Sequence, residues 1–221
     1  MFAQTKKKIY IIGSNPKDFY DLTVESIRIL SEVELIIIPK KFEKTFTNTF
    51  KDNHRNFIFE DDLAKKGGFY LWNKILDLFD KNQTIAHLCS GDSFLFNDGL
   101  RERDFFKSHN IEVVNILGII EVVNCLNNQF DLLTNREKNS SITLFEKFQF
   151  KKISNLLKHN NFEKLIVKVQ NKEDFEIILK LIKENEKKIN LKIIKNGVLQ
   201  KAKKNINIKS ADDYIFLILE K

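Results

Sequence analysis

Apolar positions fall in short continuous runs through the first half of the chain, and stretches with helical spacing separate them. A strand that is covered on both faces shows no polar alternation, so each run predicts a buried strand. The predicted strands cover residues 9–12, 35–38, 84–89 and 112–117. One predicted helix begins after Asp21, and three others cover residues 70–79, 101–108 and 119–127. Residues 40–68 are polar and poorly periodic, so no element is predicted there.

The order of these elements predicts the fold class, which is α/β. Strands that alternate with helices and end in turns indicate a parallel, doubly wound sheet. Gly13, Gly91 and Gly118 lie in the turns that follow three of the strands, and Pro39 stops the fourth. Because ligands bind outside the carboxyl ends of parallel strands, we expect the chemistry of this protein near the glycine turns.

The pattern restarts after Leu133 and predicts a second α/β domain. Its predicted strands cover residues 141–145, 164–169, 191–194, 206–208 and 214–219, and its predicted helices cover residues 153–157 and 172–185. We therefore expect a domain with a parallel sheet at residues 1–131 and one with a mixed sheet at residues 132–221. No linker rich in Pro, Gly or Ser separates them, which favours tight packing with a cleft between the two domains.

Charge and hydropathy narrow the class of partner. The net charge of +7 over 221 residues makes nucleic acid a partner to consider. The lysines are spread along the whole chain among Glu and Asp, which favours compositional bias, and we expect no nucleic-acid partner. A flat acidic substrate would also suit this charge. The first apolar run, residues 9–12, is too short for a signal peptide or a membrane span, so we expect a cytoplasmic protein without a membrane partner.

The two cysteines, Cys89 and Cys125, lie in apolar runs. Their positions match neither a metal-ligand spacing nor a disulfide framework. Buried thiols are the usual interpretation of such residues, and no metal site is expected.

Four segments carry a family resemblance. Residues 13–18 (G-S-N-P-K-D) close the first strand, and residues 87–96 (H-L-C-S-G-D-S-F-L-F) form the turn after the third. Residues 110–120 (N-I-E-V-V-N-I-L-G-I-I) and 133–143 (L-T-N-R-E-K-N-S-S-I-T) follow in the same order. Together they resemble the tetrapyrrole methylases, and the last segment is most similar to the uroporphyrinogen-III C-methyltransferase branch. Taken alone, Ser-Gly-Asp after a strand is a common turn.

The resemblance implies a function and a site. It implies a homodimeric S-adenosyl-L-methionine-dependent methyltransferase in porphyrin biosynthesis, acting on a uroporphyrinogen-III-like tetrapyrrole of the sirohaem or corrinoid pathway. It also implies two α/β domains with the cofactor cleft between them. The residues that match the family's cofactor positions are Pro16, Ser90, Gly91, Asp92, Leu95, Ile120, Glu121, Val169 and Gly197.

The chain departs from that branch on the substrate side. Pro39 stands where the branch has an Asp with a proton-accepting role, and an acidic stretch around Asp61 stands where it has a proton-donating Lys. The catalytic residues are therefore unknown. His87 replaces a family Arg, and it could contact an acceptor carboxylate or be a half-buried structural residue. Candidates to pair with substrate carboxylates are Lys40, Lys41, Arg101, Arg103 and Arg136.

Two alternatives stay open within this fold. One is a methyltransferase that acts on a precorrin or corrin ring, because other branches lack the Asp and Lys pair. The other is a catalytically impaired relative with a binding or regulatory role, which the changes at Pro39 and near Asp61 would suit.

Overall fold

The computed structural model describes residues 6–15, 21–50, 56–65, 67–95, 97–128, 141–145, 149–159, 161–185, 189–195, 198–201 and 215–220. The chain divides into two compact units, Met1–Ile120 and Glu121–Lys221. The predicted domain boundary between residues 131 and 132 lies outside the described residues. Each unit has a sheet and its own apolar core.

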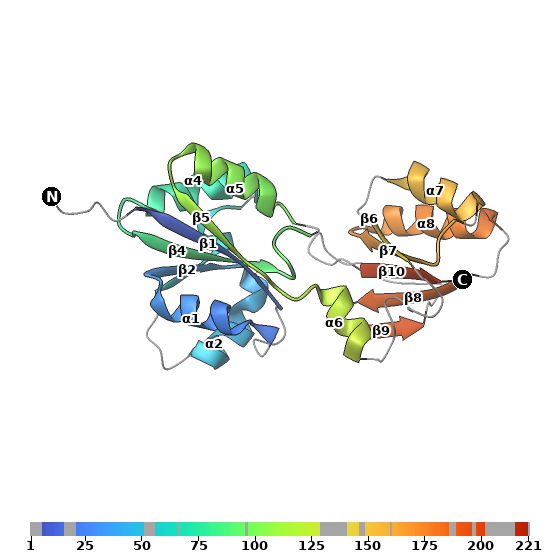
Figure 1. Ribbon diagram of the computed structural model, residues 1–221, viewed down its shortest axis with the longest axis horizontal. Helices are drawn as coiled ribbons and strands as arrows, with labels where there is room; N and C mark the ends of the chain where they lie inside the picture. The colour runs from blue at the N-terminus through green and yellow to red at the C-terminus, as the bar shows by residue number, and fades with distance from the viewer. Residues whose placement is uncertain are drawn as a thin grey trace. The chain divides into compact units, whose positions relative to one another are not determined.

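The first unit is built on a five-stranded parallel sheet (Figure 1). Its strands are β1 (Lys8–Ser14), β2 (Leu35–Ile38), β3 (Phe57–Phe59), β4 (Thr84–Ser90) and β5 (Glu112–Ile116). They lie in the order β3-β2-β4-β1-β5. The chain leaves β1 toward β2 and leaves β4 toward β5, in opposite directions, so β1 and β4 flank the topological switch point. This arrangement confirms the predicted parallel sheet.

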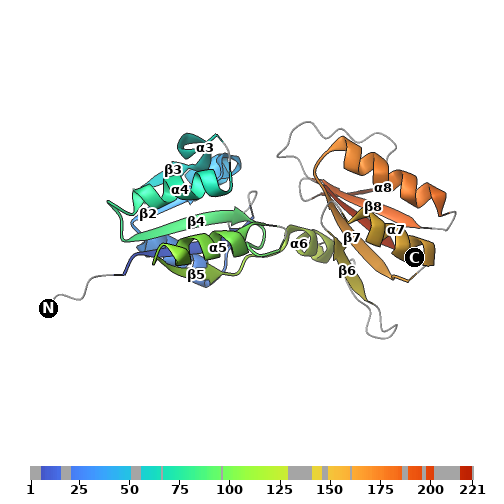
Figure 2. The ribbon, with the colours of Figure 1, turned by 90° about the horizontal axis from the view of Figure 1, so that it is seen from above.

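Helices cover both faces of this sheet. On one face lie α1 (Val24–Glu32) and α2 (Glu43–Phe50), and on the other lie α4 (Phe69–Leu78) and α5 (Gly99–Ser108), which run beside each other in Figures 1 and 2. A short 3-10 helix, η2 (Lys40–Phe42), and a single turn, α3 (Glu60–Leu63), connect the elements around β3. Thr23 begins α1 by accepting a hydrogen bond from the Ser26 amide at 3.1 Å.

Strand alternation assigns each side chain of β4 to one of the two faces. Ala86 and Leu88 pack in the core under α1 and α2, whereas Ile85 packs in the core under α4 and α5. His87 and Cys89 have the same parity as Ile85, so they also face α4 and α5. This placement brings the polar side chains of β4 under the start of α5.

Elements within residues 40–68 were missed by the periodicity argument. The segment contains η2, α2, β3 and α3. β3 is a three-residue edge strand whose first residue, Phe57, is exposed, so it shows neither an apolar run nor a full alternation. Pairing with β2 supplies the order that its own sequence does not indicate.

The second unit has a mixed sheet. Its strands are β6 (Ile142–Phe145), β7 (Lys164–Val169), β8 (Asn190–Lys195), β9 (Val198–Lys201) and β10 (Ile215–Glu220), and its helices are α6 (Glu121–Asn128), α7 (Phe150–His159) and α8 (Lys172–Glu184). The order is β6-β7-β10-β8-β9, with only β6 and β7 parallel among the paired strands. β9 was not predicted, and the predicted strand at 206–208 lies outside the described residues.

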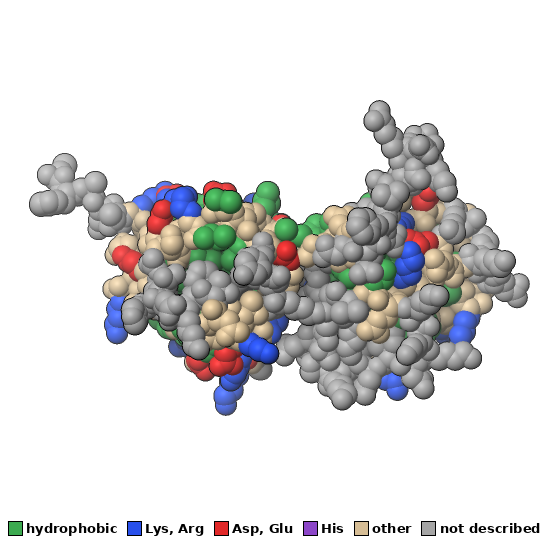
Figure 3. All heavy atoms as spheres, turned by 90° about the horizontal axis from the view of Figure 1, so that it is seen from below, with side chains coloured by type: hydrophobic (Ala, Val, Ile, Leu, Met, Phe, Trp, Pro, Cys, Tyr) green, Lys and Arg blue, Asp and Glu red, His purple; other side chains and the backbone are tan. Residues whose placement is uncertain are grey.

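Two further observations concern the charge on the surface and the length of the helices. Cationic and anionic side chains are interspersed over the described surface seen in Figure 3, consistent with lysines that are spread along the chain. Among the described residues, every helix is too short or too polar to cross a bilayer.

Candidate functional site

Three glycine turns meet at the carboxyl edge of the first sheet. A Cβ atom added to Gly13 would lie 2.7 Å from the Gly118 Cα, and one added to Gly118 would lie 2.5 Å from the Gly13 Cα. Either added atom would also collide with the Gly91 carbonyl oxygen. The backbones after β1, β4 and β5 therefore approach too closely for any side chain, and this contact explains glycine at positions 13 and 118.

Hydrogen bonds hold the turn after β4 in one conformation. Gly91 adopts φ +74°, a left-handed conformation that favours glycine, and its amide donates to the Ser14 carbonyl at 2.6 Å. The Ser14 hydroxyl donates to the Cys89 carbonyl at 3.0 Å. The Asp92 carboxylate accepts from the amides of Phe94 and Leu95 at 2.9 and 3.0 Å. The turn is thus rigid, and Asp92 is engaged within it.

Four predicted site residues, Ser90, Gly91, Asp92 and Leu95, lie together in this turn. Ser90, Asp92 and Leu95 are partly exposed, whereas Gly91 is buried. The turn follows β4, one of the two strands that flank the switch point, where open α/β sheets bind ligands.

The other predicted site residues are separated from this turn in the chain. Ile120 is half-buried at the end of the first unit, and α6 begins at Glu121. Val169 is buried at the end of β7 in the second unit, where it pairs with Ile215. The remaining two, Pro16 and Gly197, lie outside the described residues.

The two positions that depart from the branch pattern are neighbours in space. Pro39 follows β2, and Asp61 lies in the first turn of α3, directly after β3. The Lys40 amide donates to the Asp61 carboxylate at 3.3 Å. Because β2 and β3 are adjacent and parallel, both positions lie at the same carboxyl edge as the glycine turns.

The candidate cations lie in two elements, η2 and α5, and in a segment outside the described residues. Lys40 and Lys41 are exposed in η2 at the carboxyl end of β2. Arg101 lies 3.4 Å from Asp98, and its guanidinium sits over the Phe69 ring. Arg103 pairs with Asp104 at 2.7 Å, and Arg136 lies outside the described residues.

His87 is buried between two carboxylates, and it does not reach the surface. Its Nδ1 lies 2.6 Å from Glu102 Oε1, and its Nε2 lies 2.7 Å from Glu60 Oε1. The residue is 4% exposed and Glu102 is 3% exposed. The first alternative, in which His87 contacts an acceptor carboxylate, is therefore wrong, because both ring nitrogens are already engaged with protein carboxylates. His87 is a buried structural residue with a charge partner on each side.

The pKa of His87 reflects these two carboxylates. Burial alone would lower the pKa, because it penalises the charged ring. The charge of Glu102 and the hydrogen bonds to Glu102 and Glu60 outweigh burial and raise the pKa from 6.5 to about 10. At neutral pH the ring is therefore an imidazolium, and both of its N–H groups donate to a carboxylate.

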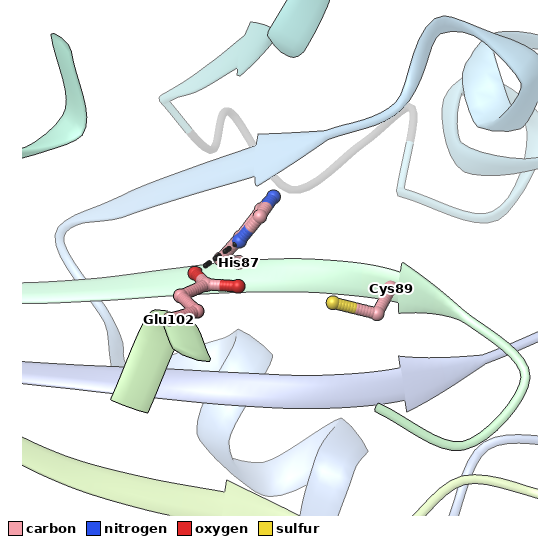
Figure 4. Close-up of side chains that lie close together, drawn as sticks. All are labelled: His87, Cys89 and Glu102. Carbon is pink, nitrogen blue, oxygen red and sulfur yellow. Dashed lines mark hydrogen bonds and ion pairs between the residues drawn. The ribbon is translucent and has the colours of Figure 1, made fainter. Parts of the chain in front are cut away.

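Cys89 lies beside His87 and Glu102, and we call these three residues the His87–Cys89–Glu102 cluster. One donor atom from each of the three residues lies within 4.8 Å of the other two. Figure 4 shows His87 and Cys89 extending from the same strand and Glu102 reaching them from α5. Burial, and then the charges of Glu102 and Glu60, raise the pKa of the Cys89 thiol well above its usual value.

The sequence argument missed this cluster. A His-x-Cys pair on a strand places both side chains on one face, which is a local signal. The two glutamates that complete the surroundings come from α5 and α3, and no local pattern pairs them with β4. Cys125, the other thiol, is buried in the second unit, as expected.

Comparisons with known sequences point to one family. The profile of the Tetrapyrrole (Corrin/Porphyrin) Methylases matches residues 8–197. The chain is 25% identical over 120 residues to a uroporphyrinogen-III C-methyltransferase of Saccharomyces cerevisiae, covering 53% of this chain and 20% of that protein. It is 26% identical over 162 residues to one from Cyanidium caldarium, covering 70% of this chain and 63% of that protein. The chain spans less than two thirds of the length of either relative.

A solved structure shows the same fold. The uroporphyrin-III C-methyl transferase from Thermus thermophilus, complexed with S-adenyl homocysteine, matches with a TM-score of 0.69. The sequences are 14% identical, and the match covers 96% of this chain and 92% of the other. This likeness confirms the fold class, while the profile match confirms the family resemblance of the four segments.

Proposed function

The chain belongs to the tetrapyrrole (corrin/porphyrin) methylases, and we propose that it is an S-adenosylmethionine-dependent C-methyltransferase acting on a uroporphyrinogen-III-like tetrapyrrole. Such an enzyme would serve the sirohaem or corrinoid pathway. The observation that carries the proposal is the preformed turn at Ser90, Gly91 and Asp92, where three glycine turns converge beside the switch point of the parallel sheet.

The residues of this turn fit an adenosyl cofactor. Gly91 has no side chain to keep a ligand from the backbone, and its φ of +74° keeps the turn in a conformation that other residues rarely adopt. The Asp92 carboxylate is engaged with two amides, so the turn is ordered before any ligand arrives. We propose that Ser90, Gly91, Asp92 and Leu95 hold the cofactor, with Pro16, Ile120, Glu121, Val169 and Gly197 as further contacts.

S-adenosylmethionine, when bound, supplies an electrophilic methyl group. The protein's share of the catalysis would then be mainly to place a nucleophilic pyrrole carbon in line and to keep water away. One proton must also leave the methylated carbon. Asp61 is an exposed carboxylate at the carboxyl edge, and it occupies the space beside Pro39, where the branch pattern places its proton acceptor.

The acceptor side supports a substrate that carries several carboxylates. Lys40 and Lys41 are exposed at the carboxyl end of β2, at the same edge as the Gly91 turn. Cations at this edge would attract a polyanionic macrocycle. We assign the first contacts with the substrate to these two lysines, because they follow β2 at the carboxyl edge of the sheet.

Two other candidates are a methyltransferase that acts on a precorrin or corrin ring and a relative whose catalysis is impaired. Pro39 has no ionisable group, and the nearby turn of α3 has three acidic residues, Glu60, Asp61 and Asp62. These carboxylates beside Lys40 and Lys41 would suit proton transfers different from those of the uroporphyrinogen branch.

Calorimetry and a transfer assay test the proposal. We expect S-adenosylhomocysteine to bind the full chain saturably, and the labelled methyl group of S-adenosylmethionine to appear on uroporphyrinogen III. Gly91→Ala should weaken binding, because alanine at this positive φ would strain the turn. Gly67→Ala is the matched control, since an added Cβ meets no atom within 4 Å there.

Each other outcome selects an alternative. Binding followed by transfer only to precorrin-2 or a later corrin-ring intermediate would assign the chain to the corrin branch. Binding without transfer to any of these acceptors would favour the impaired relative. No heat with folded protein would reject the cofactor site. The homodimer implied by the family is a separate proposal, and light scattering of the purified chain would test it.

A further inference from the structure

The side chains behind the Gly91 turn form a mixed donor set that the proposed methyl transfer does not use. His87 and Cys89 lie two positions apart on β4 and project to the same face of the sheet. Glu102 is the fourth residue of α5 and lies over that face, with its carboxylate 2.6 Å from His87 Nδ1 (Figure 4). An imidazole, a thiol and a carboxylate from two elements therefore converge at one point, where His87 and Glu102 are buried and Cys89 is partly exposed.

We propose that His87 Nδ1, Cys89 Sγ and a Glu102 carboxylate oxygen form a binding site for a divalent transition-metal cation, with Zn²⁺ as the favoured ion. The proposal is independent of methyl transfer, because it concerns the face of β4 under α5 and not the turn at the end of the strand.

The donor types decide the class of ion. Nitrogen and sulfur ligands suit Zn²⁺, Co²⁺ and related metals, whereas Mg²⁺ and Ca²⁺ prefer oxygen alone. Zn²⁺ bonds to nitrogen and oxygen at about 2.0 Å and to sulfur at about 2.3 Å, which places tetrahedral ligand atoms about 3.3–3.6 Å apart. The donor atoms here lie between 2.6 Å and 4.8 Å apart. Side-chain rotations that move the donor atoms by about 1 Å would therefore bring them to the separations expected around Zn²⁺.

Glu60 supplies the contact that a metal-bound histidine requires. Metal-ligating imidazoles usually donate their other ring N–H to a carboxylate, which fixes the ring orientation. His87 Nε2 is 2.7 Å from Glu60 Oε1 and keeps that contact, so the cation would bind at Nδ1 in place of the proton that now faces Glu102. Glu60 begins α3 and is only partly buried, so the outer contact comes from a third element.

Binding would displace two protons. A metal ligand must be deprotonated, so Cys89 would bind as the thiolate and His87 through an Nδ1 that carries no proton. The cation takes the place of the imidazolium proton on Nδ1 and of the thiol proton, and both protons are released to solvent.

The experiment uses untagged full-length protein that has been stripped with a chelator and kept reduced. Co²⁺ is titrated while absorption is recorded, because a thiolate bound to Co²⁺ adds a charge-transfer band in the near ultraviolet. We expect the band to saturate at one equivalent and to disappear when Zn²⁺ is added. Cys89→Ser, or Cys89→Ala if the serine variant is unfolded by circular dichroism, should lose the band.

The chain offers two matched variants. Cys125→Ser removes the only other thiol of the sequence and should keep the full band. Glu60→Gln should keep the band but weaken Co²⁺ binding roughly 10- to 100-fold, as expected for loss of an outer-shell carboxylate. A folded wild-type protein without a saturable band would overturn the proposal. So would a band that survives in both Cys89 variants or that Cys125→Ser removes.

Discussion

His87 Nδ1 lies 2.6 Å from Glu102 Oε1, with both residues more than nine-tenths buried. The pair joins β4 to α5 directly before the turn that we assign to the cofactor. A buried imidazolium costs free energy unless it is paired, and here Glu60 supplies a second carboxylate at 2.7 Å. Through Glu102 and Glu60, the charged His87 ring therefore connects three elements, β4, α5 and α3.

Removing one partner of this pair should destabilise the fold. For Glu102→Gln we expect a loss of about 3 kcal/mol in the free energy of unfolding, the lower end for a broken buried ion pair, because Glu60 still faces the ring. Urea unfolding measures it. Glu32→Gln is the control, since the exposed Arg28–Glu32 pair should contribute about 0–1 kcal/mol. Equal losses in both variants would contradict the buried pairing.

Stability should depend on pH through the same ring. The folded pKa of His87 is about 10, above its ordinary value of 6.5, so the folded state holds this proton more tightly. The contribution of the protonated His87 ring to the free energy of unfolding is therefore complete below pH 6.5 and is lost as the pH rises through about 10. Urea unfolding of metal-free protein at several pH values measures the slope. His87→Gln should flatten it between these limits, and an unchanged slope would argue against the raised pKa.

The contact between the glycine turns should tolerate no added atom. Gly118→Ala places a Cβ 2.5 Å from the Gly13 Cα, so backbone must shift, and we expect a loss of about 1–3 kcal/mol in the free energy of unfolding. Gly67→Ala, with open space around it, should change stability by no more than about 0.5 kcal/mol. Thermal and urea unfolding of both variants measure the contrast. A neutral Gly118→Ala would show that the turns do not touch.

The Asp92 carboxylate should act by holding the turn. Asp92→Ala removes the acceptor for the Phe94 and Leu95 amides, and we expect a loss of about 1 kcal/mol in stability together with weaker S-adenosylhomocysteine binding. Asp92→Asn keeps an acceptor oxygen and should restore most of both. Calorimetry of the two variants separates this role from direct charge attraction. Asparagine that fails to rescue binding would indicate that the negative charge itself is needed.

Local pattern was sufficient for much of this fold. The apolar runs at residues 9–12 and 35–38 lie in strands that helices cover on both faces, and such burial favours continuous apolar sequence. Alternation of these runs with amphipathic segments indicated a parallel sheet, and a parallel sheet places its turns at one edge. The turn at residues 90–92 could therefore be identified before any coordinates. β3 and β9 could not, because each is short and is ordered by the strand beside it.

Tertiary structure alone decided which distant residues meet. Sequence by itself determined the fold class, the turn at Ser90 to Asp92 and the order of the elements outside residues 40–68 and β9, since these follow from periodicities and motifs within a few residues. It did not determine that Glu60 and Glu102 enclose His87, that Asp61 lies beside Pro39, or that Gly13 touches Gly118. Those contacts join residues 15 to 105 positions apart, and they form only when distant strands pair in the sheet and helices pack on it.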